Sequence, residues 1–252
     1  MSTRDWDAAT YDRVSGPQVE WARGVLDRLA LNGDESVLDA GCGSGRVTRM
    51  LLERLPRGRV IAVDASPSMV DQARANLGDK AEVRLVELTA LDLGEEVDAV
   101  FSNAVFHWVA DHDSLFARLH AALRPGGRLV AQCGGAGNVE RFHAAAAEVG
   151  AEQPFAEHLG GWEGPWNFAG AEETGGRLVA AGFEDVQVGL ESSPVVPEFT
   201  IEYLRTVCLG HHVERLPEGL RDRYVSEVAD RCGQPVELDY VRLNIQARRP
   251  TA

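Results

Sequence analysis

The chain of 252 residues is 44% hydrophobic and 25% charged, which is typical of a soluble globular protein and long enough for one sizeable α/β domain. Its formal net charge of −14 disfavours nucleic acid and anionic membranes as partners, and it favours a small molecule or a protein as the substrate. No apolar run approaches the ~20 residues of a membrane helix, and the polar start MSTRDWDAATYDR lacks the apolar core of a signal peptide, so we expect a cytoplasmic protein.

The cysteines are scattered without CxxC or any other spacing typical of metal ligands: Cys42, Cys133, Cys208 and Cys232. This pattern argues against a zinc site and against a disulfide framework. The sequence also shows no internal repeat, low-complexity tract or interdomain linker. We therefore predict a single domain over residues 1–252, without a metal, as a monomer or homodimer.

The first predicted elements are a polar segment, residues 5–16, and a helix, residues 18–31, with apolar side chains on one face. The polar segment carries Trp6 and Tyr11. These aromatic residues either anchor a frayed terminus or belong to a lid that closes over a bound ligand. Residues 1–35 are interpreted as this N-terminal lid and helix.

The stretch SVLDAGCGSGRVT, residues 36–48, carries the main functional signal. An apolar run predicts a buried strand, a glycine-rich turn follows it, and the next residues have apolar side chains at helical spacing. Strand, turn and helix form the first half of a βαβ unit, where α/β proteins bind their ligands. Gly41 and Gly43 would let a ligand lie against the backbone, and the free amides at the helix start favour an anionic group.

The spacing of the glycines separates two kinds of nucleotide. A dinucleotide turn reads G-x-G-x-x-G, but Arg46 stands where its third glycine would be. The pattern here is D-x-G-x-G-x-G; the carboxylate of Asp39 would repel a pyrophosphate, whereas it suits a ligand with an ammonium group. The motif resembles the first motif of class I S-adenosylmethionine-dependent methyltransferases. Asp39, Gly41, Cys42 and Gly43 are predicted cofactor residues, and a turn that only reverses the chain is the alternative.

The second predicted strand, residues 59–63, ends in Asp64. An acid at this tip can accept hydrogen bonds from both ribose hydroxyls. A serine–proline pair then predicts the start of a helix. Asp64, Ala65 and Met69 are therefore predicted cofactor residues, and the alternative for Asp64 is an exposed loop acid.

The third predicted strand, residues 82–86, continues into the sequence VELTALDL, residues 86–93. In the methyltransferases that the chain resembles, an acid after this strand accepts from the adenine amino group, and the usual wording resembles VEADLTALDL. Two residues of that wording are missing here, and Asp92 lies too far along. Glu87, followed by Leu88, is the nearest replacement and is predicted to contact adenine.

The fourth predicted strand, residues 97–102, places Asn103 at its carboxyl end, where open α/β sheets hold reacting groups. Asn103 is therefore assigned to the cofactor site. A helix is expected from residues 111–113 onward, closed by LRPGG at residues 123–127. A fifth strand should follow at residues 128–133.

Five segments resemble one subgroup of these methyltransferases: WDAATYDR, LDAGCGSGRVT, VDASPSMV, FSNAVFHWVADH and LRPGG. The subgroup contains trans-aconitate 2-methyltransferase and insect juvenile hormone acid methyltransferase, and the resemblance covers roughly residues 5–133. It implies a seven-stranded Rossmann-like sheet, S-adenosyl-L-methionine as the cofactor, and a lid that brings Tyr11 to it. It also implies that His107 and Trp108 line the acceptor site, since related carboxyl methyltransferases have an amide or imidazole and a tryptophan there.

The second half of the chain is expected to add a cap and substrate-side elements, residues 134–235, to a cofactor-binding core, residues 36–133. Helices are predicted at residues 139–149, 171–181, 198–209 and 217–232, and a sixth strand at residues 185–190. Between the first two of these helices lies an aromatic loop, residues 152–168, in which Trp162 and Trp166 either form an acceptor pocket or pin the loop.

The last strand is expected within residues 236–252, where apolar and polar side chains alternate from residue 238 to residue 247. Such alternation is typical of an antiparallel strand with one wet face. The predicted fold is therefore α/β, a doubly wound, mostly parallel seven-stranded sheet with its last strand antiparallel and with helical cap insertions.

Methyl transfer from a sulfonium is an in-line displacement with a good, neutral leaving group, so alignment and water exclusion are the main tasks. A carboxylate acceptor needs no base, whereas an alcohol, phenol or carbon acid needs one. His107 is the predicted catalytic residue, as a base or as a donor to the acceptor, and a structural histidine is the alternative.

The sequence thus predicts an S-adenosylmethionine-dependent methyltransferase of a small organic acceptor, with a carboxylate oxygen as the first hypothesis. C-, N- or hydroxyl O-methylation in a natural-product pathway stays open. So do two other classes: a nicotinamide-dependent oxidoreductase, and a protein that binds S-adenosylmethionine without transferring its methyl group.

Overall fold

The computed structural model describes residues 16–251, so the predicted lid residues Trp6 and Tyr11 lie outside the described part of the chain. A seven-stranded sheet has the order β3-β2-β1-β4-β5-β7-β6. The first five of these strands run parallel, and β7 runs antiparallel to both of its neighbours. The predicted doubly wound sheet with an antiparallel last strand is confirmed. Its strands are β1 (Ser36–Ala40), β2 (Arg59–Asp64), β3 (Glu82–Leu85), β4 (Val97–Asn103), β5 (Leu123–Gly134), β6 (Glu184–Ser192) and β7 (Val241–Arg248).

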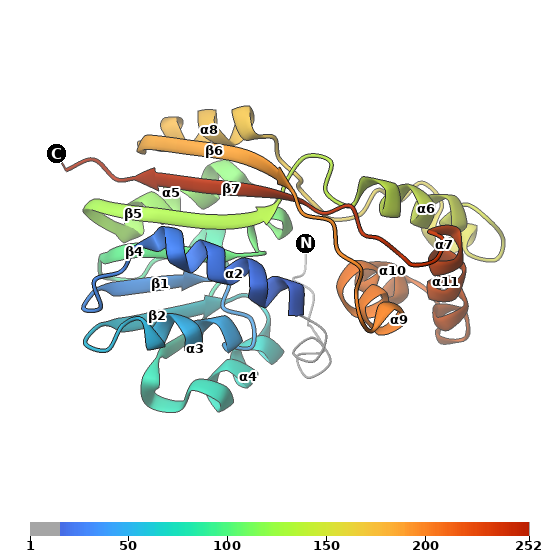
Figure 1. The fold of residues 1–252 in the computed structure, drawn as a ribbon, viewed down its shortest axis with the longest axis horizontal. Coiled ribbons are helices and arrows are strands. Elements are labelled where there is room, and N and C mark those ends of the chain that lie inside the picture. Colours follow the sequence, from blue (N-terminus) through green and yellow to red (C-terminus); the bar gives the residue numbers. More distant parts are fainter. Residues whose placement is uncertain (1–15, 252) are drawn as a thin grey trace.

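Helices cover both faces of the parallel part of the sheet (Figure 1). On one face, α2 (Gly16–Leu29), α3 (Arg46–Glu53) and α4 (Pro67–Leu77) share a buried apolar cluster with the sheet. On the other face, α5 (His112–Ala122) and α8 (Ala171–Ala180) share a second cluster. Because both faces are covered, β1, β2 and β4 are buried along most of their length, as their continuous apolar runs predict.

A cap with its own apolar core lies beyond the carboxyl ends of the parallel strands (Figure 1). It is built from two segments, one before and one after the return of α8 and β6 to the sheet. Its helices are α6 (Glu140–Gly150), α7 (Ala156–Leu159), α9 (Thr200–Tyr203), the π-helix η4 (Leu204–Cys208), α10 (Gly210–Arg215) and α11 (Glu218–Arg231). Three short 3₁₀ turns complete the described elements: η1 (Gly78–Lys80), η2 (Leu88–Ala90) and η3 (Phe106–Trp108).

Three local predictions differ from the structure. The LRPGG segment does not close a helix but belongs to β5, with a register shift against β4 that absorbs the extra residues. The helix predicted at residues 198–209 is broken, because the N–H of Leu209 donates to the carbonyl of Leu204 in a π-type turn. The aromatic loop also contains one short helix, α7.

None of the helices that the structure describes combines the length and the apolar character needed to cross a membrane. All four cysteines are free thiols. Within residues 16–251, no group of three or more His, Cys, Asp or Glu side chains is arranged to hold a metal ion.

Candidate active site

The glycine turn between β1 and α3 is bonded to β2 and packs against the segment that follows β4. Gly41 and Gly43 have positive φ angles of 88° and 54°. The N–H groups of Gly41 and Cys42 both donate to the carbonyl of Val63 at 2.9 Å, which fixes the turn to β2. A Cβ on Gly41 would lie 2.3 Å from Val105, whereas a Cβ on Gly43 would meet nothing within 4 Å. Gly41 is therefore required for packing, and Gly43 faces the space in which a ligand would lie against the backbone.

Asp64 at the end of β2 joins the glycine turn to the start of α4. Its Oδ2 accepts the N–H of Gly43 at 2.8 Å, and its Oδ1 accepts the N–H of Ser66 at 2.9 Å. Burial raises the pKa of this carboxyl, although both backbone donors favour the charged form. A carboxylate has about four lone-pair positions, so Asp64 can still accept hydrogen bonds from the two hydroxyls of a ribose.

Asp39 lies under the turn rather than on its open side. It is only 1% exposed, and its Oδ2 accepts the hydroxyl of Thr48 at 2.7 Å. Burial raises the pKa of Asp39 to about 7, and the nearby charge of Asp64 acts in the same direction. A cation bound at this point would lower that pKa and favour the charged carboxylate. The interaction of Asp39 with the ammonium group of the cofactor remains a prediction.

The other predicted cofactor residues lie along the same edge of the sheet. Asn103 ends β4; its Nδ2 donates to the carbonyl of Gln18 in α2 at 3.0 Å, and its Oδ1 is buried without a hydrogen-bond partner among residues 16–251. Glu87 is exposed just after β3, whereas the side chain of Leu88 packs into the core. Ala65 is half-buried, and Met69 is buried in the first turn of α4.

Together these groups fit S-adenosylmethionine. The glycine backbone offers an open surface, and Asp64 suits hydroxyl groups. The buried Oδ1 of Asn103 suits an N–H donor such as an ammonium group. Since the side chain of Leu88 is in the core, this residue can offer adenine only its backbone.

A cavity lies next to this edge, between the sheet and the cap. The residues that line it come from α2, the β4–α5 segment, both cap segments and β7: Gln18, Trp21, Ala104, His107, Trp108, Asn138, Val139, His143, Trp166, Phe168, Val207, Cys208, Tyr240 and Arg242. Three of the four predicted acceptor residues line it, and two of these three, His107 and Trp108, follow β4 in η3. The cavity therefore adjoins the end of the strand at which Asn103 sits.

His107 is buried, with 8% of its surface exposed. The backbone N–H of Gly134 donates to its Nδ1 at 3.2 Å. Burial, reinforced by the charge of Arg242, holds the pKa of His107 well below its usual range, so the ring is neutral at pH 7. With Nδ1 accepting, the ring proton lies on Nε2, which makes this nitrogen a hydrogen-bond donor.

The three predicted tryptophans lie close together, but only two of them line the cavity. The ring centroids of Trp108 and Trp166 are 6.2 Å apart, and both residues line the cavity. Trp162 does not line it; its ring lies 6.0 Å behind Trp166, under the guanidinium of Arg215. His143, which the sequence did not single out, stacks on Trp166 at 4.3 Å.

Arg242 in β7 is a second cavity residue that sequence reasoning missed. It is 2% exposed, and its guanidinium carbon lies 4.2 Å from the ring centroid of Trp21. The only signal for it was the alternation in the last strand, which places Arg242 on the polar face with Asn244 and Gln246.

Comparisons with known proteins agree with this fold and site. Residues 37–127 match a methyltransferase domain family. A trans-aconitate 2-methyltransferase from Variovorax paradoxus is 33% identical over 247 residues, which are 95% of this chain and 94% of that protein. The YcgJ protein of Bacillus subtilis aligns with a TM-score of 0.64 at 14% identity, over 92% of this chain and 99% of that one.

A further solved structure is phosphoethanolamine N-methyltransferase 2 of Haemonchus contortus, in complex with phosphomonomethylethanolamine and S-adenosylhomocysteine. It aligns with a TM-score of 0.64 at 19% identity, over 96% of this chain and 57% of that one.

The fold, the glycine turn and the comparisons together define this protein as an S-adenosylmethionine-dependent methyltransferase, an enzyme whose cofactor is S-adenosyl-L-methionine. Within that class, the chain belongs to the trans-aconitate 2-methyltransferase family.

Proposed function

We propose that this enzyme transfers the methyl group to a carboxylate oxygen of a small organic acid, held in the cavity between the sheet edge and the cap. One observation carries the proposal. None of the described side chains that line the cavity is suited to take a proton from an acceptor near neutral pH.

The titratable groups of the cavity support this point. Burial lowers the pKa of His107 well below its usual range and that of His143 to about 4. Burial also raises the pKa of Cys208 to about 12 and that of Tyr240 well above its usual value, so both stay protonated. An efficient general base has a pKa near the operating pH. The acceptor should therefore arrive already deprotonated, as a carboxylic acid does near neutral pH and an alcohol or alkylamine does not.

When bound, the cofactor supplies an electrophilic methyl group on a sulfonium. A carboxylate oxygen forms the new C–O bond as the C–S bond breaks and its electron pair goes to sulfur, which yields a methyl ester and S-adenosylhomocysteine without proton transfer. The Nε2–H of His107 would orient the acceptor carboxylate, and Trp108 and Trp166 would exclude water from it. The name of the relative from Variovorax paradoxus, which specifies trans-aconitate, agrees with an organic acid as the acceptor.

The test is an acceptor screen with methyl-labelled S-adenosylmethionine. The panel contains trans-aconitate and simple mono- and dicarboxylic acids, each with its matched primary amide and alcohol. We expect label in the acids alone, and mild alkali should release it as methanol, since esters hydrolyse and methyl ethers and amines do not. Transfer of label to the alcohols or amides, stable to alkali, would contradict carboxyl methylation.

Variants of His107 distinguish a donor from a base. Loss of a hydrogen bond to a charged group should lower kcat of His107→Ala by roughly tenfold to a hundredfold, whereas His107→Gln retains an N–H donor and should recover part of the rate. For the wild type, kcat should stay flat between pH 6 and pH 9. A rise in kcat with an apparent pKa between 6 and 8 that is lost in His107→Ala would instead assign the base role to His107.

A further inference from the structure

A second concave surface lies at the end of the sheet opposite to the cap, where β5 begins and β7 ends (Figure 1). It is an open groove of about 750 Å³, a volume typical of small-molecule sites. We call it the arginine groove, after Arg28, Arg124, Arg128 and Arg248, which line it. Asp185 is the one acid among the described residues that line it, although the chain has a net charge of −14. Positive charge gathered in a groove of so acidic a protein points to an anionic ligand.

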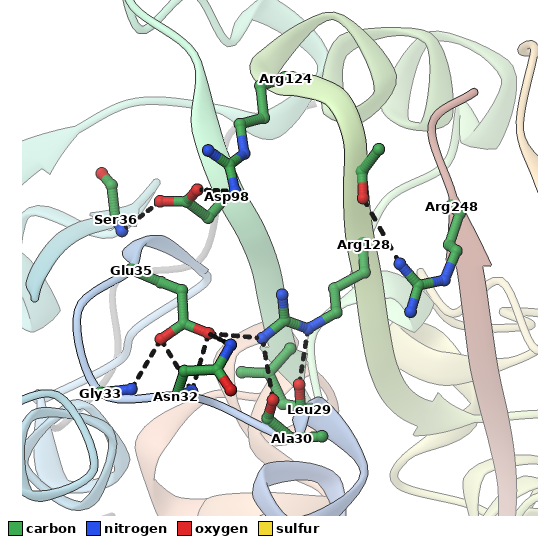
Figure 2. Close-up of polar contacts among 11 residues, drawn as sticks. Leu29, Ala30, Asn32, Gly33, Glu35, Ser36, Asp98, Arg124, Arg128 and Arg248 are labelled. Atoms are coloured by element: carbon green, nitrogen blue, oxygen red, sulfur yellow. Dashed lines mark hydrogen bonds and ion pairs between the residues drawn. The ribbon is translucent and has the colours of Figure 1, made fainter. Parts of the chain in front are cut away.

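Two of these arginines are direct neighbours across the sheet. Arg128 of β5 pairs with Arg248 of β7 in the antiparallel ladder, so their Cβ atoms lie on the same face, about 5 Å apart. Like charges at directly opposite positions destabilise a sheet. Glu35 offsets the charge of Arg128 at 3.0 Å (Figure 2). Arg248 has only long contacts within the described chain, at 4.0 Å to Asp185 and at 3.5 Å to the carbonyl of Gly126, so part of the repulsion is left for an anion to relieve.

The other two arginines also keep N–H groups for a ligand. Arg124 contacts Asp98 through one nitrogen at 2.6 Å, and its side chain is 61% exposed (Figure 2). The Nε of Arg28 is buried without a hydrogen-bond partner among residues 16–251. Burial lowers the pKa of Arg28, and the charges of Glu191 and Asp27 offset this effect only in part. An anion in the groove would stabilise this half-buried guanidinium.

The lining of the groove defines the chemistry of its ligand. The amide side chains of Asn32, Gln187 and Gln246 accompany the arginines, and none of the described residues that line the groove is aromatic. The groove thus offers hydrogen-bond donors but no ring on which a nucleobase would stack. A phosphate group has three oxygens and a charge of about −1.5 to −2, so it can bridge two neighbouring guanidiniums better than a carboxylate can. Because the rest of the chain is acidic overall, a compact ligand fits better than a polymer.

We propose that the arginine groove is a second binding site, separate from the active site, for a small metabolite that carries at least two phosphate groups. One phosphate group accounts for Arg128 and Arg248, and a second accounts for Arg28 and Arg124. Two turns of α2, about 10 Å, separate Arg28 from Trp21, which lines the acceptor cavity. The site is therefore independent of the cofactor and of the acceptor that is methylated.

Isothermal titration calorimetry of the whole enzyme with inorganic pyrophosphate at low ionic strength tests the site. Pyrophosphate should bind at least about tenfold more tightly than phosphate or citrate, and saturating S-adenosylhomocysteine should leave its Kd unchanged. Fructose 1,6-bisphosphate is titrated in parallel. Tighter binding than that of pyrophosphate would identify a phosphate ester as the ligand, since the amide side chains can bind its hydroxyl groups, and weaker binding would identify the inorganic anion.

Arg248→Gln should weaken the binding of pyrophosphate by at least about tenfold. Arg59→Gln is the matched control: the side chains of Arg59 and Arg248 are 52% and 53% exposed at the same end of the sheet, but Arg59 does not line the groove. Without ligand, Arg248→Gln should have a Tm equal to or above that of the wild type, because it removes the repulsion with Arg128. Pyrophosphate should raise the Tm of the wild type and of Arg59→Gln, but not that of Arg248→Gln.

Four results would overturn the site. They are no binding of pyrophosphate, wild-type affinity in Arg248→Gln, equal weakening in Arg248→Gln and Arg59→Gln, and loss of binding when S-adenosylhomocysteine is present. The third would reduce the effect to net charge, and the fourth would place the anion in the active site. Citrate that binds as tightly as pyrophosphate would contradict phosphate as the ligand chemistry. None of these results bears on the proposed carboxyl methylation.

Discussion

At the scale of single residues, Asp64 combines a structural and a proposed binding role. Its two oxygens accept the N–H groups of Gly43 and Ser66, so the carboxylate holds the glycine turn against the start of α4. The same group is the proposed acceptor for the ribose hydroxyls. One side chain would thus set the shape of the cofactor site and bind the cofactor.

Asp64→Asn should weaken the binding of S-adenosylhomocysteine by at least about tenfold, because the neutral amide forms weaker hydrogen bonds than a carboxylate. Isothermal titration calorimetry measures the effect. Asp79→Asn, an exposed acid after α4, is the control and should bind like the wild type. An unchanged Kd for Asp64→Asn would remove Asp64 from the ribose site.

The sequence predicted residues whose role depends on local backbone, and it missed those whose role depends on distant neighbours. The positive φ angles of Gly41 and Gly43 and the position of Asp64 follow from a motif of consecutive elements. Arg242 reaches the cavity only because β7 pairs with β5 and brings it to Gln132, more than a hundred residues away in the chain. No local pattern contains that information.

At the scale of elements, the glycine turn and the β4–α5 segment form one unit. Val105 lies where a Cβ of Gly41 would be, so the segment that carries His107 packs directly on the turn. Because Gly41 has no Cβ, this segment, with the proposed acceptor residue His107, can pack close to the turn.

Gly41→Ala should lower Tm by several degrees, because it adds both a clash with Val105 and a side chain at a φ of 88°. Val105→Ala in the same chain should recover part of the loss, since it removes the clash but not the strain. Gly43→Ala, with a φ of 54° and open space at its Cβ, should lower Tm less. Thermal unfolding measures the Tm of each variant. An equal fall in Tm in all three variants would refute the packing role of Gly41.

The elements that the sequence misplaced share one cause, which is tertiary context. LRPGG has the composition of a helix end followed by a turn, but pairing with β4 draws it into β5 around a register shift. Residues 198–209 have a helical pattern, but packing within the cap accommodates them as one short helix, α9, followed by the π-helix η4. Propensity favours one structure, and neighbours that are remote in sequence select another.

At the scale of the whole molecule, the sheet is held at the end opposite to the cap by a partly buried ion pair (Figure 2). Arg128 of β5 donates to Glu35 at 3.0 Å and to the carbonyl of Leu29 at the end of α2 at 2.6 Å. Glu35 also accepts the N–H groups of Asn32 and Gly33. Burial alone would raise the pKa of Glu35, but these donors lower it to about 2.

This carboxylate should make stability depend on pH in the acid range. Its pKa is lower in the folded than in the unfolded chain, so its contribution is complete above about pH 5 and is lost as the pH falls towards 2. Glu35→Gln should lower the free energy of unfolding at pH 7 by roughly 3 kcal/mol, and the difference from the wild type should shrink by pH 3. Urea unfolding at pH 7 and pH 3 measures this difference in the free energy of unfolding, with the exposed Glu157→Gln as control. A difference independent of pH would contradict the ion-pair account.

The most direct measurement is a crystal structure of the enzyme with S-adenosylhomocysteine and an accepted organic acid. The account predicts the nucleoside against Gly43 and Asp64, the sulfur open to the cavity, and an acid group of the acceptor beside His107. A nucleoside bound elsewhere, or a sulfur turned away from that cavity, would contradict it.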